Sequence, residues 1–334
     1  MLKTQTVRDR GLRRGSAFLR SNGLLIALVV LVALLTIGDP AFLSPTNLAN
    51  VLGQWAPAGI MAAAATYVII GRGFDLSVAS GFSLCAIAAA GTAAAGYSNE
   101  IAFAAALVAG LLVGCFNAAL VCGLGINPFI ATIGTGFVLL GLDILATPNA
   151  SITVDQAGFD TLGSGSWHGL PFKGIVLICF LVMGQIFLAK SKYGRYLYAI
   201  GGNPEASRLS GLSVGLIRSI TYIFSGFTMG VAGSLAASQL SSAQAQMEPT
   251  IVFDVIAIVV LGGTSLSGGV GSVWRTAIGL AIVAAISNGF TLLGLHPYYQ
   301  NIAKGVVIIL AVAIEGFVHR RAVTRTPADA AAAN

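Results

Sequence analysis

Long apolar runs, separated by short polar segments, fill most of the chain after residue 21. A helix needs about 20 residues to cross the hydrocarbon core of a bilayer, and ten runs come near that length. They occupy residues 22–38, 50–70, 75–96, 101–123, 127–147, 171–189, 215–237, 250–262, 272–294 and 299–317. The pattern predicts an all-α polytopic membrane protein with about ten transmembrane helices, of which the eighth is short.

Composition supports this interpretation. The chain is 56% hydrophobic and only 9% charged, whereas soluble domains carry roughly 25% charged residues. So little charge cannot cover the surface of a water-soluble particle of this size. The 42 glycines suit close packing of helices in lipid. The four cysteines lie in apolar runs without paired spacing, which indicates neither a disulfide framework nor a zinc site.

Basic residues fall almost entirely on one side if the N-terminus is cytoplasmic and the spans alternate. Of the 18 Lys and Arg residues, only Lys173 then lies outside and Lys304 lies within the last span, which leaves 16 in cytoplasmic segments. Because cytoplasmic loops carry an excess of Lys and Arg, we expect both termini in the cytoplasm. The first apolar run is long for a signal peptide and no small-residue cleavage site follows it, so it should remain as a span.

This topology gives a cytoplasmic basic tail at residues 1–21, a single transmembrane domain at 22–318 and a cytoplasmic tail at 319–334. Two longer polar segments interrupt the transmembrane domain. The loop at 148–170 contains acidic residues but no Lys or Arg, and is expected on the outer side of the membrane. The loop at 190–214 is basic and is expected on the cytoplasmic side.

The stretch NPEASRLSG, at residues 203–211, is the most polar short helix candidate in the cytoplasmic loop. Asn203 can cap a helix, Pro204 suits its first position and Gly211 can end it. The simplest interpretation is a solvated connection. A rigid short helix lying along the membrane could also dock into a groove on a partner.

The stretch GRGFDLSVASG, at residues 71–81, places Asp75 between two apolar runs. Ionisable residues at membrane depth are costly and are usually paired or functional. Arg72 is a candidate partner for the Asp75 carboxylate. Asp75, Ser77 and Ser80 could cap the following helix or line a permeation path, and both alternatives stay open here.

Other polar residues lie inside the spans, among them Asn127, Thr132 and Asp254. They suit either hydrogen bonds between helices or a path for a hydroxyl-rich solute. The glycine-rich stretch at 261–272 lacks the Lys of a phosphate-binding loop, so we interpret it as a tight turn and expect no ATP site in this chain. The patterns GLLVG at 110–114 and GFTMG at 226–230 favour helix packing within one subunit over a dimer interface.

One motif carries a family resemblance. Glu205, Ala206, Ser207 and Gly211 match the pattern E-A-[AS]-x-x-x-G, which resembles the EAA motif in permease subunits of ABC importers. DLSVASG, LSSAQ and AIVVLGGTSLSGGVGS resemble signatures of ribose-type monosaccharide permeases, and the resemblance covers about residues 45–317. The chain departs from that pattern at Ala79, where Gly is usual, and at Arg72, in a context that is typically Gly-Gly.

The resemblance implies a multi-pass permease of the bacterial inner membrane that moves a pentose or hexose inward. It implies a second permease copy as homodimer or heterodimer, a cytoplasmic ABC ATPase that binds ATP and Mg, and a periplasmic sugar-binding protein. The chain itself would be no enzyme and would hold no cofactor, metal or catalytic residue. The alternatives are a permease of a branched-chain amino-acid ABC importer and a secondary sugar transporter that couples to ions at Asp75 or Asp254.

The resemblance also assigns roles to residues. The segment that couples the chain to the ATPase would comprise Asn203, Pro204, Glu205, Ala206, Ser207 and Gly211. The translocation path would include Asp75, Ser77, Ser80, Asn127, Thr132 and Asp254.

Overall fold

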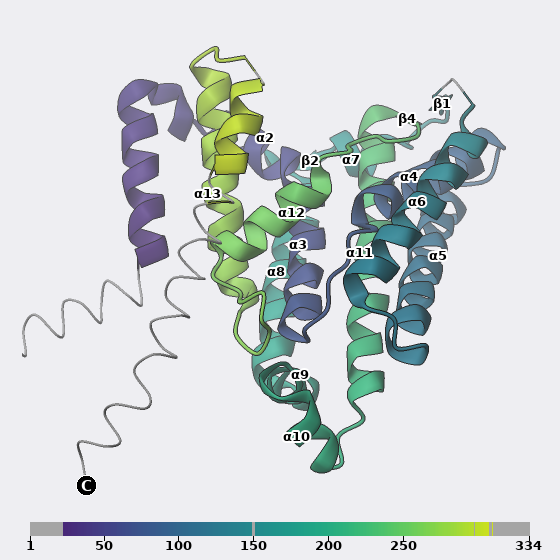
Figure 1. Cartoon of the computed structure of the whole chain (residues 1–334). Helices are drawn as coiled ribbons and strands as arrows, with labels where there is room; N and C mark the ends of the chain where they lie inside the picture. The colour runs from purple at the N-terminus through teal and green to yellow at the C-terminus, as the bar shows by residue number, and fades with distance from the viewer. Residues whose placement is uncertain (1–22, 149–150, 297, 307–308, 310–334) are drawn as a thin grey trace, which may run out of the picture.

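The computed structural model describes residues 23–148, 151–296, 298–306 and 309, and this part of the chain is mostly helical. The long helices stand side by side, with α9 and α10 at one end and the short strands at the other (Figure 1). After a first helix at Gly23–Gly38, the elements in chain order are η1 (Pro40–Leu43), α2 (Pro45–Gln54), α3 (Ala56–Ile70), α4 (Val78–Ala94), α5 (Asn99–Ala118), η2 (Ala119–Gly123), α6 (Pro128–Ala146), β1 (Ile152–Thr153), α7 (Thr161–Ser164), β2 (Ser166–Trp167), β3 (Leu170–Pro171), α8 (Phe172–Lys190), α9 (Lys192–Gly202), α10 (Pro204–Leu209), α11 (Val214–Leu240), β4 (Ser242–Ala243), α12 (Ile251–Leu261) and α13 (Val273–Leu292).

Five helical segments are long and apolar enough to cross a bilayer, and the pair α2 and α3, bent by 53°, would add a sixth. The five are Asn99–Gly123, Pro128–Ala146, Phe172–Lys190, Val214–Leu240 and Val273–Leu292. The first helix, α4 and α12 are apolar but shorter. The prediction of a mostly helical, polytopic membrane protein is therefore confirmed, while the count of ten spans stays a prediction. The two expected tails, and most of the tenth run beyond residue 306, lie outside the described residues.

Helix α3 is the most enclosed element, because all 15 of its residues are buried. It packs against α8, α11, α12 and α13. A helix that is apolar on every face belongs in the centre of a bundle, and its few hydroxyls are satisfied there: the Thr66 and Thr276 side-chain oxygens lie 2.7 Å apart. The C-terminus of α3 leads directly into residues 71–77, so this polar segment is held among the helices.

Helices α5 and α11 approach each other closely through glycines. A Cβ atom on Gly110 would overlap the carbonyl oxygen of Gly226, and one on Gly114 would overlap that of Tyr222. A Cβ on Gly230 would likewise press on the carbonyl oxygen of Ala106. Small residues at this spacing let two backbones touch. The expectation that both G-x-x-x-G patterns serve packing within the subunit is confirmed.

The loop around residues 151–170 folds back onto the C-terminal end of α11. Strand β1 pairs antiparallel with β4, with Ile152 opposite Ala243. The backbone N–H of Gly163 donates to the Ser238 hydroxyl at 2.8 Å, and that hydroxyl donates to the carbonyl of Phe159 at 2.6 Å. This end of the bundle is therefore tied down by both strand pairing and side-chain hydrogen bonds.

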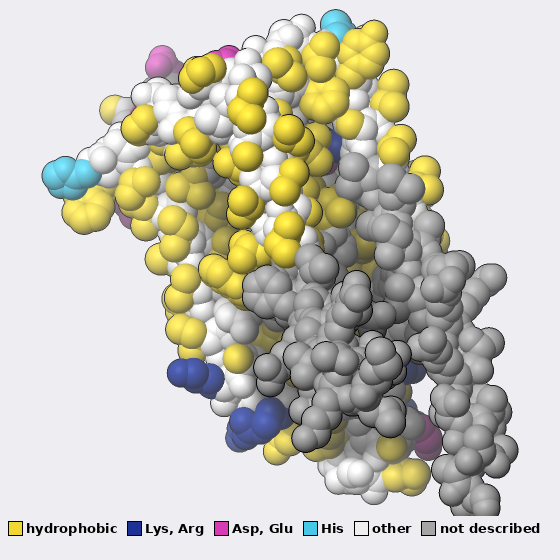
Figure 2. All heavy atoms as spheres, turned by 90° about the vertical axis from the view of Figure 1, so that its left-hand side faces the viewer, with side chains coloured by type: hydrophobic (Ala, Val, Ile, Leu, Met, Phe, Trp, Pro, Cys, Tyr) yellow, Lys and Arg dark blue, Asp and Glu magenta, His cyan; other side chains and the backbone are white. Residues whose placement is uncertain are grey.

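Side-chain types are unevenly distributed over the surface. Figure 2 shows hydrophobic side chains over the middle of one face and Lys and Arg side chains gathered beneath them, toward the end that carries α9 and α10. An apolar band of this kind is what a chain in lipid presents, because the tails offer no hydrogen-bonding partners.

Candidate functional site

The stretch at 203–211 folds as its capping residues predict. Asn203 is the N-cap of α10, and its side-chain oxygen accepts from the backbone N–H of Ala206 at 3.0 Å. Pro204 occupies the first turn. Gly211 follows the helix with a φ of 83°, a left-handed conformation that favours glycine. The predicted short helix is confirmed.

One side of α10 faces the protein and the rest faces outward. Ser207 is buried and donates to the carbonyl of Asn203 at 2.8 Å. Glu205 and Arg208 are exposed, and the Leu209 side chain is 81% exposed. An acid, a base and a large apolar side chain are thus presented together at the end of the bundle, which is suitable for contact with another protein.

Arg72 connects this region to the end of α3. Its Nε donates to the carbonyl of Gly201 at 2.7 Å and its Nη2 to that of Gly202 at 2.9 Å, so the guanidinium holds the last two residues of α9, just before α10. The backbone of Arg72 has a φ of 60°. The Arg72 side chain, named above as a candidate partner of Asp75, instead donates to the free carbonyls at the C-terminus of a helix, as basic side chains commonly do.

The glycine-rich loop between α12 and α13 also contacts the ends of α3 and α9. The backbone N–H of Gly269 donates to the carbonyl of Ile70 at 2.9 Å, and a Cβ atom on Gly201 would overlap the Gly269 nitrogen. The Tyr198 hydroxyl on α9 donates to the carbonyl of Gly271 at 2.6 Å. Burial raises the pKa of Tyr198, partly offset by Arg275, so the hydroxyl keeps the proton that it donates. The end of α3, the end of α9 and this loop form one junction.

Asp75 lies at the centre of a second group of contacts. Its Oδ1 accepts from the Ser77 hydroxyl at 2.6 Å, the Ser77 backbone N–H at 3.2 Å and the Asn117 amide at 3.3 Å. Its Oδ2 accepts from the Ser225 hydroxyl at 2.8 Å. Four donors converge on the carboxylate from three parts of the chain. These hydrogen bonds hold α5, α11 and the segment after α3 together.

Residues 71–77 interrupt the helical ladder between α3 and α4, and side chains satisfy the exposed backbone. The N–H of Leu76 donates to the Thr132 hydroxyl at 3.0 Å. The Tyr222 hydroxyl donates to the carbonyl of Phe74 at 3.2 Å. Irregular backbone at membrane depth persists only where protein or a cavity covers it.

The predicted path residues do not form one group. Asp75, Ser77 and Thr132 come together, whereas Asn127 caps α6 by accepting from the N–H of Phe129 at 3.0 Å. Ser80 is half-buried in the first turn of α4.

Asp254 is engaged elsewhere. Its Oδ1 forms an ion pair with Lys304 Nζ at 2.8 Å, and that ammonium lies 5.1 Å from the centre of the Trp55 ring. An intramembrane carboxylate with such a partner has a structural explanation.

Two residues that hold the segment at 71–77 carried no signal in the sequence. Ser225 and Tyr222 lie about 150 residues from their partners, inside an apolar run that reads as a plain span. The described residues contain no group of three or more His, Cys, Asp or Glu side chains that could hold a metal ion.

Comparisons with known proteins cover most of the chain. The family described as "Branched-chain amino acid transport system / permease component" matches residues 47–312. The ribose import permease protein RbsC of Bacillus subtilis is 37% identical over 295 residues, which cover 88% of this chain and 92% of that protein. RbsC of Escherichia coli K12 is 37% identical over 318 residues, covering 94% and 99%.

A third relative transports a different sugar. The galactose/methyl galactoside import permease protein MglC of Escherichia coli K12 is 33% identical over 327 residues, covering 91% of this chain and 96% of that protein. No solved structure matches the chain significantly.

Proposed function

This chain belongs to the family of permease components of branched-chain amino acid transport systems, and from that membership we propose that it is the membrane subunit of an ABC importer for a monosaccharide. It is a multi-pass membrane protein and a transporter subunit, not itself an enzyme. The proposed substrate is a pentose or a hexose. The ribose and galactose permeases that match nearly their full length support a sugar over an amino acid.

The observation that carries the proposal is the exposed helix α10 and its attachment to the bundle. Glu205, Arg208 and Leu209 face outward. Arg72 fastens the residues just before α10 to the end of α3. A subunit that pushed on α10 would therefore also act on the segment that contains Asp75. Asn203, Pro204, Glu205, Ala206, Ser207 and Gly211 are proposed as the coupling segment.

The remaining parts of the importer are proposed from the family. ATP and Mg would bind to a separate cytoplasmic ATPase, and a periplasmic sugar-binding protein would deliver the substrate. Two permease copies, identical or related, would enclose the path between them. Within this chain we propose ten spans in a permease domain at 22–318, with cytoplasmic tails at 1–21 and 319–334, a coupling loop at 190–214 and a periplasmic loop at 148–170.

For the translocation path, the group of Asp75, Ser77 and Thr132 is the best supported part, because it lies in a break between helices and is rich in hydrogen-bonding groups. Ser80, Asn127 and Asp254 stay in the proposal with weaker support. The Asp254 ion pair with Lys304 already accounts for that carboxylate.

Reversing a charge on α10 tests the coupling role. The permease, its ATPase and its sugar-binding protein would be reconstituted in proteoliposomes, with Glu205→Lys compared against the parent. We expect the ATPase to co-purify less well with this variant and ATP-driven uptake of labelled ribose or galactose to fall about tenfold or more, as for loss of a central interface contact.

The matched control is Asp155→Lys. Asp155 is also exposed but lies in the loop at the opposite end of the bundle. This variant should keep the ATPase bound. Full co-purification and full uptake with Glu205→Lys would remove α10 from the coupling role.

A second candidate function follows from the family description itself, which names branched-chain amino acids. Competition distinguishes the two: excess unlabelled leucine should leave sugar uptake unchanged. Uptake by the chain alone, driven by an ion gradient without ATPase, would instead favour a secondary transporter.

A further inference from the structure

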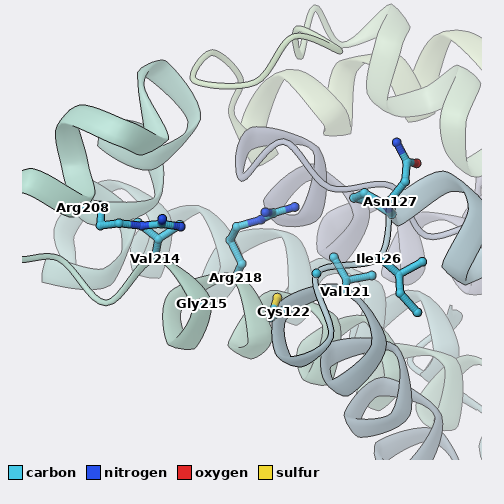
Figure 3. A pocket seen from close by; sticks show the side chains of 10 residues that line it. Val121, Cys122, Ile126, Asn127, Arg208, Val214, Gly215 and Arg218 are labelled. Atoms are coloured by element: carbon cyan, nitrogen blue, oxygen red, sulfur yellow. The ribbon is translucent and has the colours of Figure 1, made fainter.

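A pocket lies beside α10 and includes Arg208 and Asn127 among its lining residues, but none of the roles described above uses it. It has a volume of about 240 Å³ and is bordered by α10, the first turns of α11 and the turn between α5 and α6. The Arg208 side chain extends from α10 toward Arg218, whose own side chain extends toward the start of α6 near Asn127 (Figure 3). A water molecule takes up roughly 30 Å³ in the liquid, so the pocket has room for a polyatomic anion.

The charges that line this pocket are all positive. Arg208 and Arg218 contribute two guanidinium groups, and none of the lining residues is acidic. Among the described residues, the ion pair found is that of Asp254 with Lys304, so neither arginine is neutralised by a carboxylate of this part of the chain. Two cations on different elements that share one cavity repel each other, and an anion bound between them would offset that repulsion.

The hydrogen bonds of Arg218 are incomplete. Its Nη2 donates to the carbonyl of Arg72 at 3.3 Å, but its Nε is buried without a partner. A buried donor without an acceptor is costly. The pocket also borders the N-terminus of α6, which is 19 residues long, and the positive end of a helix dipole favours an anion nearby.

We propose that this pocket binds a phosphate ester, held between the Arg208 and Arg218 guanidinium groups. Arginine presents paired donors that match phosphate oxygens. The remaining walls include Val121, Ile126 and Val214, which suit the carbon part of an ester better than bare phosphate. Two sources share this chemistry: the headgroup of an anionic phospholipid, because basic pockets between membrane helices bind such headgroups, and a soluble phosphate monoester.

The site has a consequence for α10. A bound phosphate would link α10 to α11 through one ligand, because Arg208 lies on the first and Arg218 on the second. The inference goes beyond the proposed transport function and does not depend on it, since binding is measured on the permease without its ATPase.

Binding is tested on the full chain with two probes. In neutral detergent, glycerol 3-phosphate is titrated by calorimetry. In parallel, the chain is purified from nanodiscs that contain phosphatidylglycerol and phosphatidylcholine in equal amounts, and retained lipid is counted by native mass spectrometry. We expect Arg208→Gln and Arg218→Gln each to weaken binding about tenfold or more.

The matched control is Arg195→Gln, because Arg195 is exposed on α9, outside the pocket, where it donates to the carbonyl of Lys190. It should bind like the parent. Arg-dependent binding of glycerol 3-phosphate identifies a soluble ligand, and Arg-dependent retention of phosphatidylglycerol alone identifies a lipid. If Arg218→Gln fails to fold, the result with Arg208→Gln decides between the outcomes, because the Arg208 side chain is exposed and its replacement should not disturb folding. Equal binding of both probes by the parent, Arg208→Gln and Arg195→Gln overturns the proposal.

Discussion

At the scale of single residues, Asp75 has the densest set of polar contacts among the candidate site residues. All four of its partners are donors. A carboxylate accepts from all of them at once, which explains why an acid is placed at a depth where a charge is otherwise expensive. The same contacts make Asp75 structural as well as a candidate for the path.

Substitutions at Asp75 should separate the contribution of its hydrogen-bonding capacity to stability from the contribution of its charge. Asp75→Ala removes the acceptor of the Ser77 and Ser225 hydroxyls and should lower the free energy of unfolding by about 2–3 kcal/mol. Asp75→Asn should cost less, about 1 kcal/mol, because the Ser225 hydroxyl can rotate and accept from the new amide. Thermal unfolding in detergent measures both.

Asp155→Asn serves as the exposed control and should be neutral. If Asp75→Asn and Asp75→Ala were equally destabilising, the charge of the carboxylate, and not its hydrogen-bonding capacity, would be the main contribution.

The sequence predicted Asp75 as special but not its partners. Its neighbours Ser77 and Arg72 were visible in the same stretch, and proximity along the chain favoured an Arg72–Asp75 pair. The fold separates them because the left-handed Arg72 backbone directs its side chain to α9. Ser225 could not be found from the sequence, since only the packing of α11 beside this segment brings it within reach.

At the scale of elements, capping residues determined α10 with little help from the rest of the fold. Asn203, Pro204 and Gly211 each satisfy a local requirement of a helix end, and the structure places the helix between them. The ends of a short helix can be predicted from the sequence in this way, because each capping residue acts on its own neighbours in the chain. The break at 71–77 was harder to place, because its backbone is satisfied by Thr132 and Tyr222 from distant helices.

The glycine contact between α5 and α11 supplies a test at this scale. Gly226→Ala places a methyl group against the Gly110 carbonyl oxygen, so the helices must separate, and we expect a loss of about 1–3 kcal/mol in unfolding free energy. The yield of folded protein and its thermal unfolding in detergent measure the effect.

Gly134→Ala is the matched control on α6, where nothing lies within 4 Å of an added Cβ. Because Ala favours a helix over Gly by roughly 1 kcal/mol, this variant should be neutral or slightly more stable. A Gly226→Ala protein as stable as the parent would mean that α5 and α11 are less tightly apposed than described.

At the scale of the whole molecule, the predicted sidedness can be measured directly. In a background in which the four cysteines are replaced, we introduce Asp155→Cys or Arg195→Cys, both at exposed positions. A membrane-impermeant maleimide should label Asp155→Cys in intact spheroplasts. It should label Arg195→Cys only after the membrane is opened, because basic segments stay in the cytoplasm.

Labelling of both variants from outside would require a different number of spans between residues 155 and 195. The charge distribution alone predicts this topology, and the labelling experiment tests it. Hydropathy also predicted that the eighth span is short, as α12 is with 11 residues. It could not reveal that α2 and α3 form a bent pair, because hydropathy records apolar length and not the path of the backbone.

Helix α11 extends without a break for 27 residues, about 40 Å at 1.5 Å per residue. Its first turn follows α10, and its last turn holds the loop with Gly163 through Ser238. A continuous helix anchored at both ends has no hinge at which a displacement could be absorbed. If docking at one end shifts this helix, thermodynamic reciprocity requires that docking at the other end be favoured or opposed by the same factor. The affinity for the partner at either end of α11 would then depend on whether the partner on the opposite side of the membrane is bound.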